Sequence, residues 1–221
     1  MDILGATAQY EKWMAARIRV VKEDLAYKHE QMRESPFAFL RATFYRWIQL
    51  WKEFCETEAS APAVLAVGDL HIENFGTWRD SEGRLIWGIN DFDEAFPLPY
   101  TFDLVRLGSS ARLAIKLENL TIGTLEACDA ILEGYTEAIR SGGRPFVLDE
   151  EHVGLPRKRD EARILHAMGF ETANVHLGSP EAIKAIRHDL DKRPARWLYK
   201  KAKRMVKAVE SDWRQWRNWA K

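Results

Sequence analysis

The sequence predicts a mainly helical α+β domain, built around a small β element that carries the chain's unusual polar residues. Apolar side chains recur at helical spacing through most of the chain, whereas residues 63–67 form a short apolar run of the length found in buried strands. Two further short segments, 75–78 and 85–89, flank a polar turn and predict a hairpin. With 221 residues, of which 46% are hydrophobic and 30% charged, the chain can form one full-sized domain. We expect a single domain over residues 1–221.

Cysteine usage and the length of the apolar runs limit the class of protein. Cys55 and Cys128 stand alone, without a CxxC pair or a cluster of Cys and His. This argues against a zinc site and a disulfide framework, and it favours a reducing compartment. The N-terminus has no apolar signal-like stretch, and the apolar runs are far too short to cross a bilayer. We therefore expect a cytoplasmic protein without a membrane span.

The first sixty residues predict two helices. Residues 6–32 keep helical apolar spacing without Gly or Pro, and a second helix is expected over 37–58. Between them, Ser35 can cap a helix and Pro36 suits its first turn. The second helix has a thick aromatic face that we expect in the core. The members of this face are Phe37, Phe44, Tyr45, Trp47, Trp51 and Phe54.

The helical pattern resumes beyond Pro97 and Pro99 and continues to the end of the chain. The expected helices cover residues 102–116, 121–140, 156–169, 180–190 and 194–218, and Ser141-Gly142-Gly143 ends the second of them. The domain is therefore expected to consist of a helical N-terminal segment (1–60), a motif-bearing core (61–118) and a helical C-terminal part (119–221).

Two polar segments follow strands of the β element, 68–76 after the first strand and 90–94 after the hairpin. The hairpin folds them toward each other, so their carboxylates would repel unless something positive lies between them. Oxygen ligands of this kind favour Mg²⁺ or Mn²⁺. The alternative is that these residues only form turns and caps, as Asp and Asn often do. The polar residues are Asp69, His71, Glu73, Asn74, Asn90, Asp91, Asp93 and Glu94.

The spacing within these segments is more specific than their composition. Kinase-type phosphotransferases need an Asp that orients or deprotonates the attacking hydroxyl, an Asn five residues later on a metal, and a further Asp after a short hairpin. Asp69 and Asn74 have this Asp-x4-Asn spacing, and Asp91 follows the hairpin within an Asp-Phe-Asp sequence.

These motifs resemble the catalytic loop of the aminoglycoside phosphotransferase and choline kinase branch of kinase-like proteins, often written H-G-D-x-H-x-x-N, with Val67 in place of the first His. Over about residues 28–115 the sequence is more similar still to an uncharacterised kinase-like family, the domain of unknown function numbered two-two-five-two. Four motifs in order carry this resemblance. They are Ser35-Pro-Phe-Ala-Phe-Leu-Arg41, Gly68-Asp-Leu-His-Ile-Glu-Asn-Phe-Gly76, Asn90-Asp-Phe-Asp-Glu94 and Phe102-Asp-Leu-Val-Arg-Leu107.

The resemblance implies a protein-kinase-like catalytic lobe of the C-terminal type, with a small β-hairpin element. It implies Asp69 as the catalytic base, Asn74 and Asp91 as metal ligands, and Asp93 as a second-metal or accessory carboxylate. Asp103 would brace the catalytic loop through its backbone N–H groups rather than touch the substrate.

The phosphate-binding part of an ordinary kinase is missing from the sequence. No GxGxxG or GxxxxGK occurs, and no glycine lies between Gly5 and Gly68. Longer members of the resembled family carry a Gly-rich, Lys-bearing segment after the Asp-Phe-Asp motif. We therefore expect no ordinary nucleotide-binding N-terminal lobe, and ATP is in question as the phosphate donor.

Other side chains near the motifs could contact a cofactor. Arg41, like Arg33, could reach phosphates or pair with acidic residues. His71 could act as a ligand or an acid, or it could brace the loop, because a neutral imidazole both donates and accepts hydrogen bonds. Arg106, one helical turn beyond Asp103, is expected to form an internal ion pair.

Three functions are compatible with these residues. The first is Mg²⁺-dependent phosphotransfer to a hydroxyl of a small molecule or a protein, with Mn²⁺ as the alternative metal. The second is a catalytically degenerate kinase-like module that binds a ligand or partner without chemistry. The third is a metal-dependent hydrolase that uses the same carboxylates.

The C-terminal segment is basic although the whole chain is neutral. Residues 192–221 contain 11 basic and 2 acidic side chains, whereas residues 1–191 contain 22 basic and 31 acidic ones. Trp213, Trp216 and Trp219 lie among the basic residues, a pattern that suits single-stranded nucleic acid or an anionic membrane surface. We favour the alternative that this helix packs its Trp, Met and Val face on the acidic body and exposes Lys to water.

Overall fold

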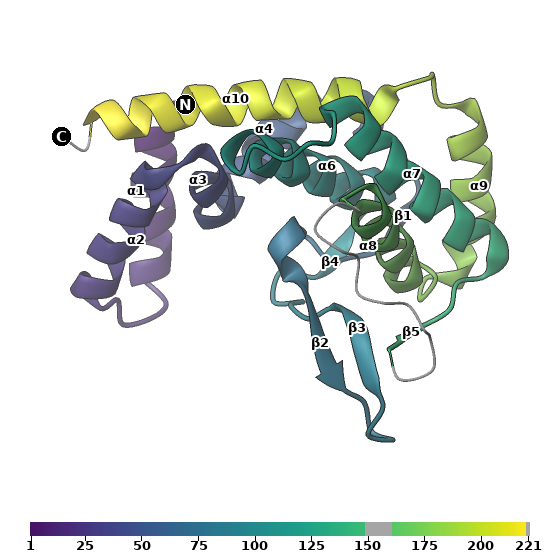
Figure 1. Ribbon diagram of the computed structural model, residues 1–221. Coiled ribbons are helices and arrows are strands. Elements are labelled where there is room, and N and C mark those ends of the chain that lie inside the picture. Colours follow the sequence, from purple (N-terminus) through teal and green to yellow (C-terminus); the bar gives the residue numbers. More distant parts are fainter. Residues whose placement is uncertain (149–160, 220–221) are drawn as a thin grey trace.

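The computed structural model describes residues 1–148 and 161–219. The long helix α10 (Trp197–Trp219) runs along one side of the molecule, and the other helices pack beneath it (Figure 1). A hairpin of β2 (Phe75–Arg79) and β3 (Leu85–Ile89) projects from the opposite side (Figure 1). The prediction of a mainly helical α+β protein with a small β-hairpin is therefore confirmed.

The N-terminal segment is helical as predicted, but its helices are shorter. The expected helix over 6–32 is two helices, and the expected helix over 37–58 is three. They are α1 (Ile3–Ala15), α2 (Lys22–Glu34), α3 (Pro36–Ala42), α4 (Phe44–Phe54) and α5 (Glu56–Ala59). β-Branched Ile18, Val20 and Val21 lie where the first prediction fails, and such residues lose side-chain freedom in a helix. At the second break, the Thr43 hydroxyl donates to the Phe39 carbonyl at 2.6 Å and the Thr43 backbone leaves helical geometry.

The strands form two small antiparallel sheets. In the first, β1 (Ala63–Ala66) pairs with β4 (Phe96–Pro99), which the sequence did not predict. In the second, β3 lies between β2 and the two-residue strand β5 (Phe146–Val147). The hairpin turn is closed by Asp80, whose carboxylate accepts hydrogen bonds from the N–H groups of Glu82 and Arg84. Pairing of β1 with β4 brings the two polar segments to one end of the hairpin.

Helix α6 (Tyr100–Leu117) forms the centre of the core. Every residue from Tyr100 to Ile115 is buried. Six of them are polar: Thr101, Asp103, Arg106, Ser109, Ser110 and Arg112. A helix that is buried on all sides needs partners for such groups, because unpaired buried polar groups are costly. Two of these residues, Asp103 and Arg106, provide the support of the candidate site.

The C-terminal part is helical, as predicted, with shifted bounds. Helix α7 (Thr124–Ser141) ends at the expected Ser-Gly-Gly sequence. The helix expected over 156–169 lies partly outside the described residues, and the structure has α8 at Glu161–His176. A short 3-10 turn (Pro180–Ala182) and α9 (Ile183–Lys192) then lead to α10.

Helix α10 packs its apolar face on the body, as predicted, and a nucleic-acid or membrane partner of the basic segment stays untested. Trp197, Met205, Val206 and Trp216 are buried in this face, whereas Trp219 is 59% exposed. Attraction between a basic helix and an acidic body accounts for only some of the ion pairs that α10 forms. Lys201 pairs with Glu58 of the body, but the two acidic residues of α10 pair with basic residues of the body, at Arg46–Asp212 and Lys116–Glu210.

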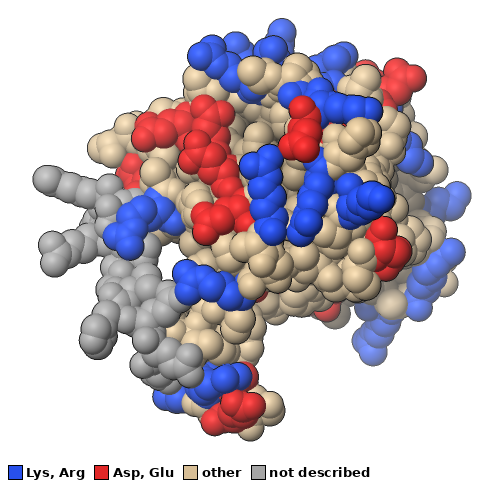
Figure 2. Space-filling model, turned by 90° about the vertical axis from the view of Figure 1, so that its right-hand side faces the viewer, with Lys and Arg blue, Asp and Glu red and all other residues tan. Residues whose placement is uncertain are grey.

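The neutral total charge is unevenly distributed over the surface. On the face that contains α9, patches of Lys and Arg lie beside patches of Asp and Glu (Figure 2).

Among the described helices, none is both long and apolar enough to cross a bilayer.

Candidate functional site

The segment between β1 and β2, residues 67–74, is held by a buried carboxylate. Asp103 of α6 accepts hydrogen bonds from the N–H of Val67 at 2.7 Å and from the N–H of Gly68 at 3.0 Å. The Asp103 side chain is fully buried. The expected bracing of the loop by Asp103 is therefore confirmed. We call residues 67–74 the braced loop.

The second half of the braced loop is a short 3-10 turn closed by its own side chains. The Asn74 side-chain oxygen accepts from the His71 N–H at 3.0 Å, and His71 Nδ1 accepts from the Glu73 N–H at 3.2 Å. Ser110 of α6 accepts from the Ile72 N–H at 3.2 Å. The bonds of His71 and Asn74 form a reciprocal capping arrangement. His71, predicted to bind a cofactor, and Asn74, predicted to bind a metal, therefore also support the loop itself.

His71 is uncharged in this arrangement. Burial lowers its pKa to about 3, and the positive charges of Arg106 and Arg41 act in the same direction. A neutral imidazole has the acceptor nitrogen that the Glu73 N–H requires. The loop-bracing alternative for His71 is therefore observed, while its contact with a cofactor stays a prediction.

Asp69 lies in the middle of the braced loop and faces a buried arginine. Arg106 Nε donates to Asp69 Oδ1 at 2.7 Å, and its Nη2 donates both to the same oxygen and to the Leu40 carbonyl. The guanidinium is fully buried between the rings of Phe44 and Trp47, at 5.0 and 4.9 Å from their centroids. The internal ion pair expected of Arg106 is confirmed, and its partner is the predicted catalytic base.

The two oxygens of the Asp69 carboxylate are not equivalent. Oδ1 is engaged by Arg106, while Oδ2 receives no hydrogen bond from any described residue, and the side chain remains 16% exposed. Burial raises the pKa of Asp69, Arg106 opposes this rise, and the negative charge of Asp91 adds to it. The arrangement leaves one oxygen of a fixed, partly desolvated carboxylate available for chemistry.

The second polar segment, residues 90–94, lies against the braced loop, and we call it the acidic segment. The Asn90 N–H donates to the Asn74 carbonyl at 3.0 Å, which joins the two segments at the end of the hairpin. Gly68 has φ +88°, and a Cβ atom there would lie 2.3 Å from the Glu94 carbonyl oxygen. The predicted convergence of the two segments is therefore observed, and it requires glycine at position 68.

The acidic side chains of this segment are exposed and influence one another. Asp91, Asp93 and Glu94 all lie at the surface, and Asp91 accepts a hydrogen bond from the Asp93 N–H at 3.2 Å. Partial burial raises the pKa of Glu94, and the charges of Asp69, Asp91 and Asp93 raise it further. Glu94 belongs to the predicted constellation but not to the predicted metal ligands, and three acidic side chains act on it.

The donor chemistry of the acidic segment fits a hard divalent cation. Among residues 1–148 and 161–219, no three His, Cys, Asp or Glu side chains converge on one point as a ready-made metal site. Mg²⁺ does not require such a cage, because it usually keeps several waters and binds one or two carboxylates together with substrate phosphates. The residues present are therefore compatible with Mg²⁺ held by two carboxylates, and the roles of Asp91, Asp93 and Asn74 as ligands stay predictions.

Arg41, the predicted phosphate contact, is exposed and pairs with the braced loop. Its guanidinium forms an ion pair with Glu73 of the braced loop, and the two side chains are 47% and 50% exposed. Exposed pairs of this kind contribute little to stability and exchange readily. The alternative of pairing with an acidic residue is therefore observed for Arg41, its charge also acts on Asp69, and its contact with phosphate stays a prediction.

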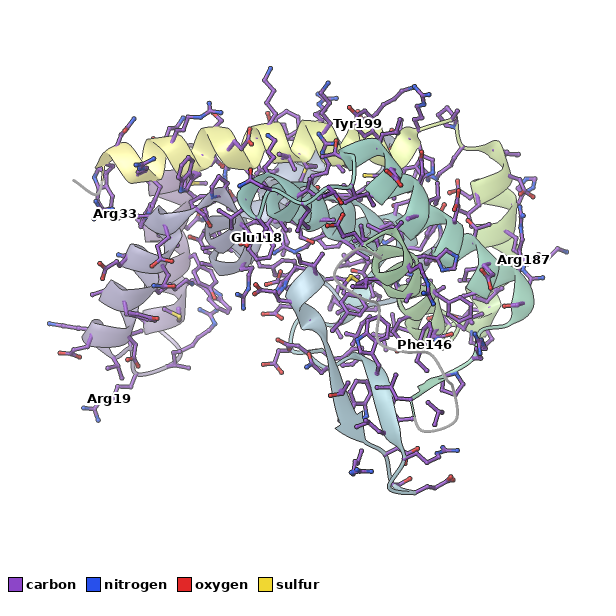
Figure 3. All side chains as sticks on the ribbon, in the orientation of Figure 1. Arg19, Arg33, Glu118, Phe146, Arg187 and Tyr199 are labelled. Atoms are coloured by element: carbon purple, nitrogen blue, oxygen red, sulfur yellow. The ribbon has the colours of Figure 1, made fainter. Side chains whose placement is uncertain are left out.

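A separate cavity of about 620 Å³ lies beside the hairpin, between β3, β5, α7 and α8. Phe146, labelled in Figure 3, packs there against Trp87 at 5.3 Å and Phe170 at 5.5 Å between ring centroids. Phe75, directly after Asn74, stacks on Trp87 at 5.4 Å. None of the predicted site residues is among the described residues that line this cavity.

The comparison with protein families finds a match over the region that contains the braced loop and the acidic segment. A family model described as an uncharacterised protein conserved in bacteria (DUF2252) matches residues 19–153, more than half of the chain. The chain belongs to this family. No curated protein and no solved structure matches the chain. The matched region contains both polar segments and their support from α6, whereas α8, α9 and α10 lie outside it.

Proposed function

We propose that this DUF2252 protein is a Mg²⁺-dependent phosphotransferase that acts on a hydroxyl group, with Asp69 as the general base. The observation that carries the proposal is the state of the Asp69 carboxylate. It is fixed by Arg106 through one oxygen, open at the other, and adjacent to a segment of three exposed acidic side chains.

Each part of this arrangement has a chemical role in the proposal. The substrate hydroxyl would donate to Oδ2 of Asp69 and transfer its proton there as the oxygen attacks the terminal phosphorus of the phosphate donor. The bond from that phosphorus to the donor's bridging oxygen would break, so the rest of the donor (ADP, where the donor is ATP) would leave with the bridging oxygen and its electron pair. Burial raises the pKa of Asp69, which makes the carboxylate a better proton acceptor than an exposed one. Arg106 keeps the carboxylate from rotating, and Arg41 would exchange Glu73 for a phosphate oxygen.

Divalent metal and a phosphate donor complete the proposed reaction. Mg²⁺ would supply charge neutralisation at the transferred phosphate. Asp91, Asp93 and Glu94 are the carboxylates suited to hold it, with Asn74 orienting the loop beside them. The kinase-like form of the lobe belongs to the same proposal, supported by the Asp-x4-Asn spacing, the intervening hairpin and the braced loop. ATP is the donor to test first, although the chain has no Gly-rich phosphate loop.

A second candidate is a binding module without catalysis. The observation that favours it is the ion pair with the fully buried Arg106, which occupies one oxygen of Asp69 and opposes the rise that burial causes in the pKa of this carboxyl. A hydrolase would use the same carboxylates with water in place of the substrate hydroxyl. The three candidates differ in whether Asp69 is needed for turnover and whether a hydroxyl acceptor is required.

The decisive experiment is calorimetry with ATP, ADP or GTP in the presence of Mg²⁺, followed by a turnover assay. We expect nucleotide binding in the wild type, and Asp69→Asn should abolish turnover while leaving binding nearly intact, since a base acts on the transition state. Asp129→Asn on α7 is the matched control and should change neither. Binding without turnover would favour the binding module, and turnover that survives Asp69→Asn would discard Asp69 as the base. Phosphate release without any hydroxyl acceptor would indicate the hydrolase.

A further inference from the structure

A buried chain of hydrogen bonds continues from the braced loop into α7 and α8. His176, the last residue of α8, places Nε2 at 3.0 Å from Asp103 Oδ2, and its Nδ1 lies 2.9 Å from the Tyr135 hydroxyl of α7. Asp103, His176 and Tyr135 are each fully buried. These hydrogen bonds are not predictable from the sequence, because His176 lies 73 residues after Asp103 and outside the region that the family model matches.

One arrangement gives every donor of these two hydrogen bonds a partner, including the Tyr135 O–H. A carboxylate only accepts hydrogen bonds, so His176 Nε2 must carry the proton that Asp103 receives. Burial raises the pKa of Tyr135 well above its usual range, so its hydroxyl is protonated. Among the described residues this hydroxyl has His176 Nδ1 as its hydrogen-bonding partner, so it donates to Nδ1. In this arrangement the His176 imidazole donates from Nε2 and accepts at Nδ1.

This series of hydrogen bonds ends at the Asp103 carboxylate, which also holds the braced loop. Asp103 Oδ2 accepts from both His176 Nε2 and the Val67 N–H, while Oδ1 accepts from the Gly68 N–H, directly before Asp69. The ring of His176 is itself fixed by an edge-on contact with Tyr135, at 5.5 Å between centroids. Loss of the Nε2 donor would therefore free Asp103 to rotate away from the two N–H groups.

We propose that His176 is a positioning residue for Asp69: its Nε2–H fixes the Asp103 carboxylate that holds the loop, and Tyr135 selects the tautomer. The proposal rests on the proposed function only in naming Asp69 as the working group. His176 thereby couples α8, which lies outside the family match, to the geometry of the site.

Two substitutions of His176 separate its two contacts. His176→Gln can place an amide N–H near the position of Nε2 and so keep the bond to Asp103. His176→Asn reaches only the position of Nδ1 and loses that bond. We expect amide hydrogen exchange at Val67 and Gly68 to be about tenfold faster in His176→Asn and to stay within about threefold of the wild type in His176→Gln. His166→Asn, on the partly exposed face of the same helix, is the matched control and should leave both amides unchanged.

The tautomer provides a readout that a merely space-filling histidine would not give. In wild-type protein labelled with ¹⁵N-histidine, His176 should show the Nε2–H tautomer at pH 7, and Tyr135→Phe should weaken that preference. Equal exchange in the Gln and Asn variants, or a wild-type Nδ1–H tautomer, would overturn the proposal. The wild-type tautomer still tests whether His176 donates to Asp103 even if the His176→Asn variant does not fold.

The failure of this proposal and that of the proposed function are distinguishable. A split between the Gln and Asn variants in a protein without turnover would sustain the positioning role and discard the phosphotransferase. Turnover that depends on Asp69, together with equal turnover and equal loop exchange in the Gln and Asn variants, would sustain the phosphotransferase and discard the positioning role of His176.

Discussion

The two halves of the candidate site differ in how strongly the fold holds them. In the braced loop, the N–H groups of Val67, Gly68, His71, Ile72 and Glu73 all donate to side chains of α6 or of the loop itself. In the acidic segment, the side chains of residues 90–94 are all exposed, and the described hydrogen bonds of Asp93 and Ala95 are local turns. The fold thus fixes the candidate base and the candidate ligand Asn74, and it leaves the candidate cation carboxylates loosely held.

This difference has a physical reason. A base must be positioned within a few tenths of an ångström to act, so the cost of fixing it is met by buried hydrogen bonds. Three neighbouring carboxylates repel one another, and a fold that fixed them without a cation would be destabilised. Looseness in the acidic segment is therefore what the proposed Mg²⁺ site requires, and the following predictions test the contrast in order of expected effect.

The largest effect is expected from the ion pair that holds Asp69. Arg106→Met leaves the Asp69 carboxylate partly buried without its partner, which should lower the free energy of unfolding by about 3 to 5 kcal/mol. Arg41→Met removes an exposed pair with Glu73 and should cost no more than about 1 kcal/mol. Urea denaturation measures both. Equal losses for the two variants would contradict the contrast between a rigid and a loose half.

The pH dependence of stability should reveal the buried state of His71. Its pKa is about 3 in the folded protein and near 6.5 when unfolded, so the unfolded state binds the proton first as pH falls. The stability that neutral His71 contributes is complete above pH 6.5 and is lost as pH falls toward 3. His71→Asn keeps an acceptor for the Glu73 N–H without titrating, so the advantage of the wild type over it should shrink by up to about 1.4 kcal/mol per pH unit in this window. Urea denaturation of both proteins at several pH values measures this difference in stability. A difference that does not change with pH would contradict a buried, neutral His71. His188→Asn, at an exposed histidine, is the control.

A smaller effect of opposite sign is expected at Glu171, where α8 meets the end of the hairpin. A Cβ atom at Gly88 would lie 2.4 Å from Glu171 Oε1, and burial raises the pKa of this carboxyl to about 7. A raised carboxyl pKa contributes stability below about pH 4.5 that is lost as pH rises through 7. Glu171→Gln should therefore gain on the order of 1 to 2 kcal/mol relative to the wild type at pH 8 and nothing at pH 4.5. Exposed Glu181→Gln serves as the comparison, and the same gain at both pH values would count against a buried, titrating Glu171.

The sequence predicts the local features of the site and its two supports on α6, but not the groups that lie behind Asp103. The strand, the hairpin and the convergence of Asp69 with Asp91 follow from spacing and alternation within about thirty residues. The breaks at residues 16–21 and Thr43 were missed because helical apolar spacing continues across them, and local side-chain effects end the helices there. His176 and Tyr135 were missed because contacts between distant helices leave no periodic signal, and in a sequence a buried histidine looks like any other.

Amide hydrogen exchange with and without Mg²⁺ tests the central claim most directly. Without metal, the amides of residues 67–74 should be strongly protected and those of 91–95 should exchange rapidly. Millimolar Mg²⁺ should slow exchange in residues 91–95 and leave the braced loop unchanged, and Asp91→Asn should remove that response. Equal protection of the two segments without metal, or an acidic segment that does not respond to Mg²⁺, would contradict the division into a fixed base and a loose cation site.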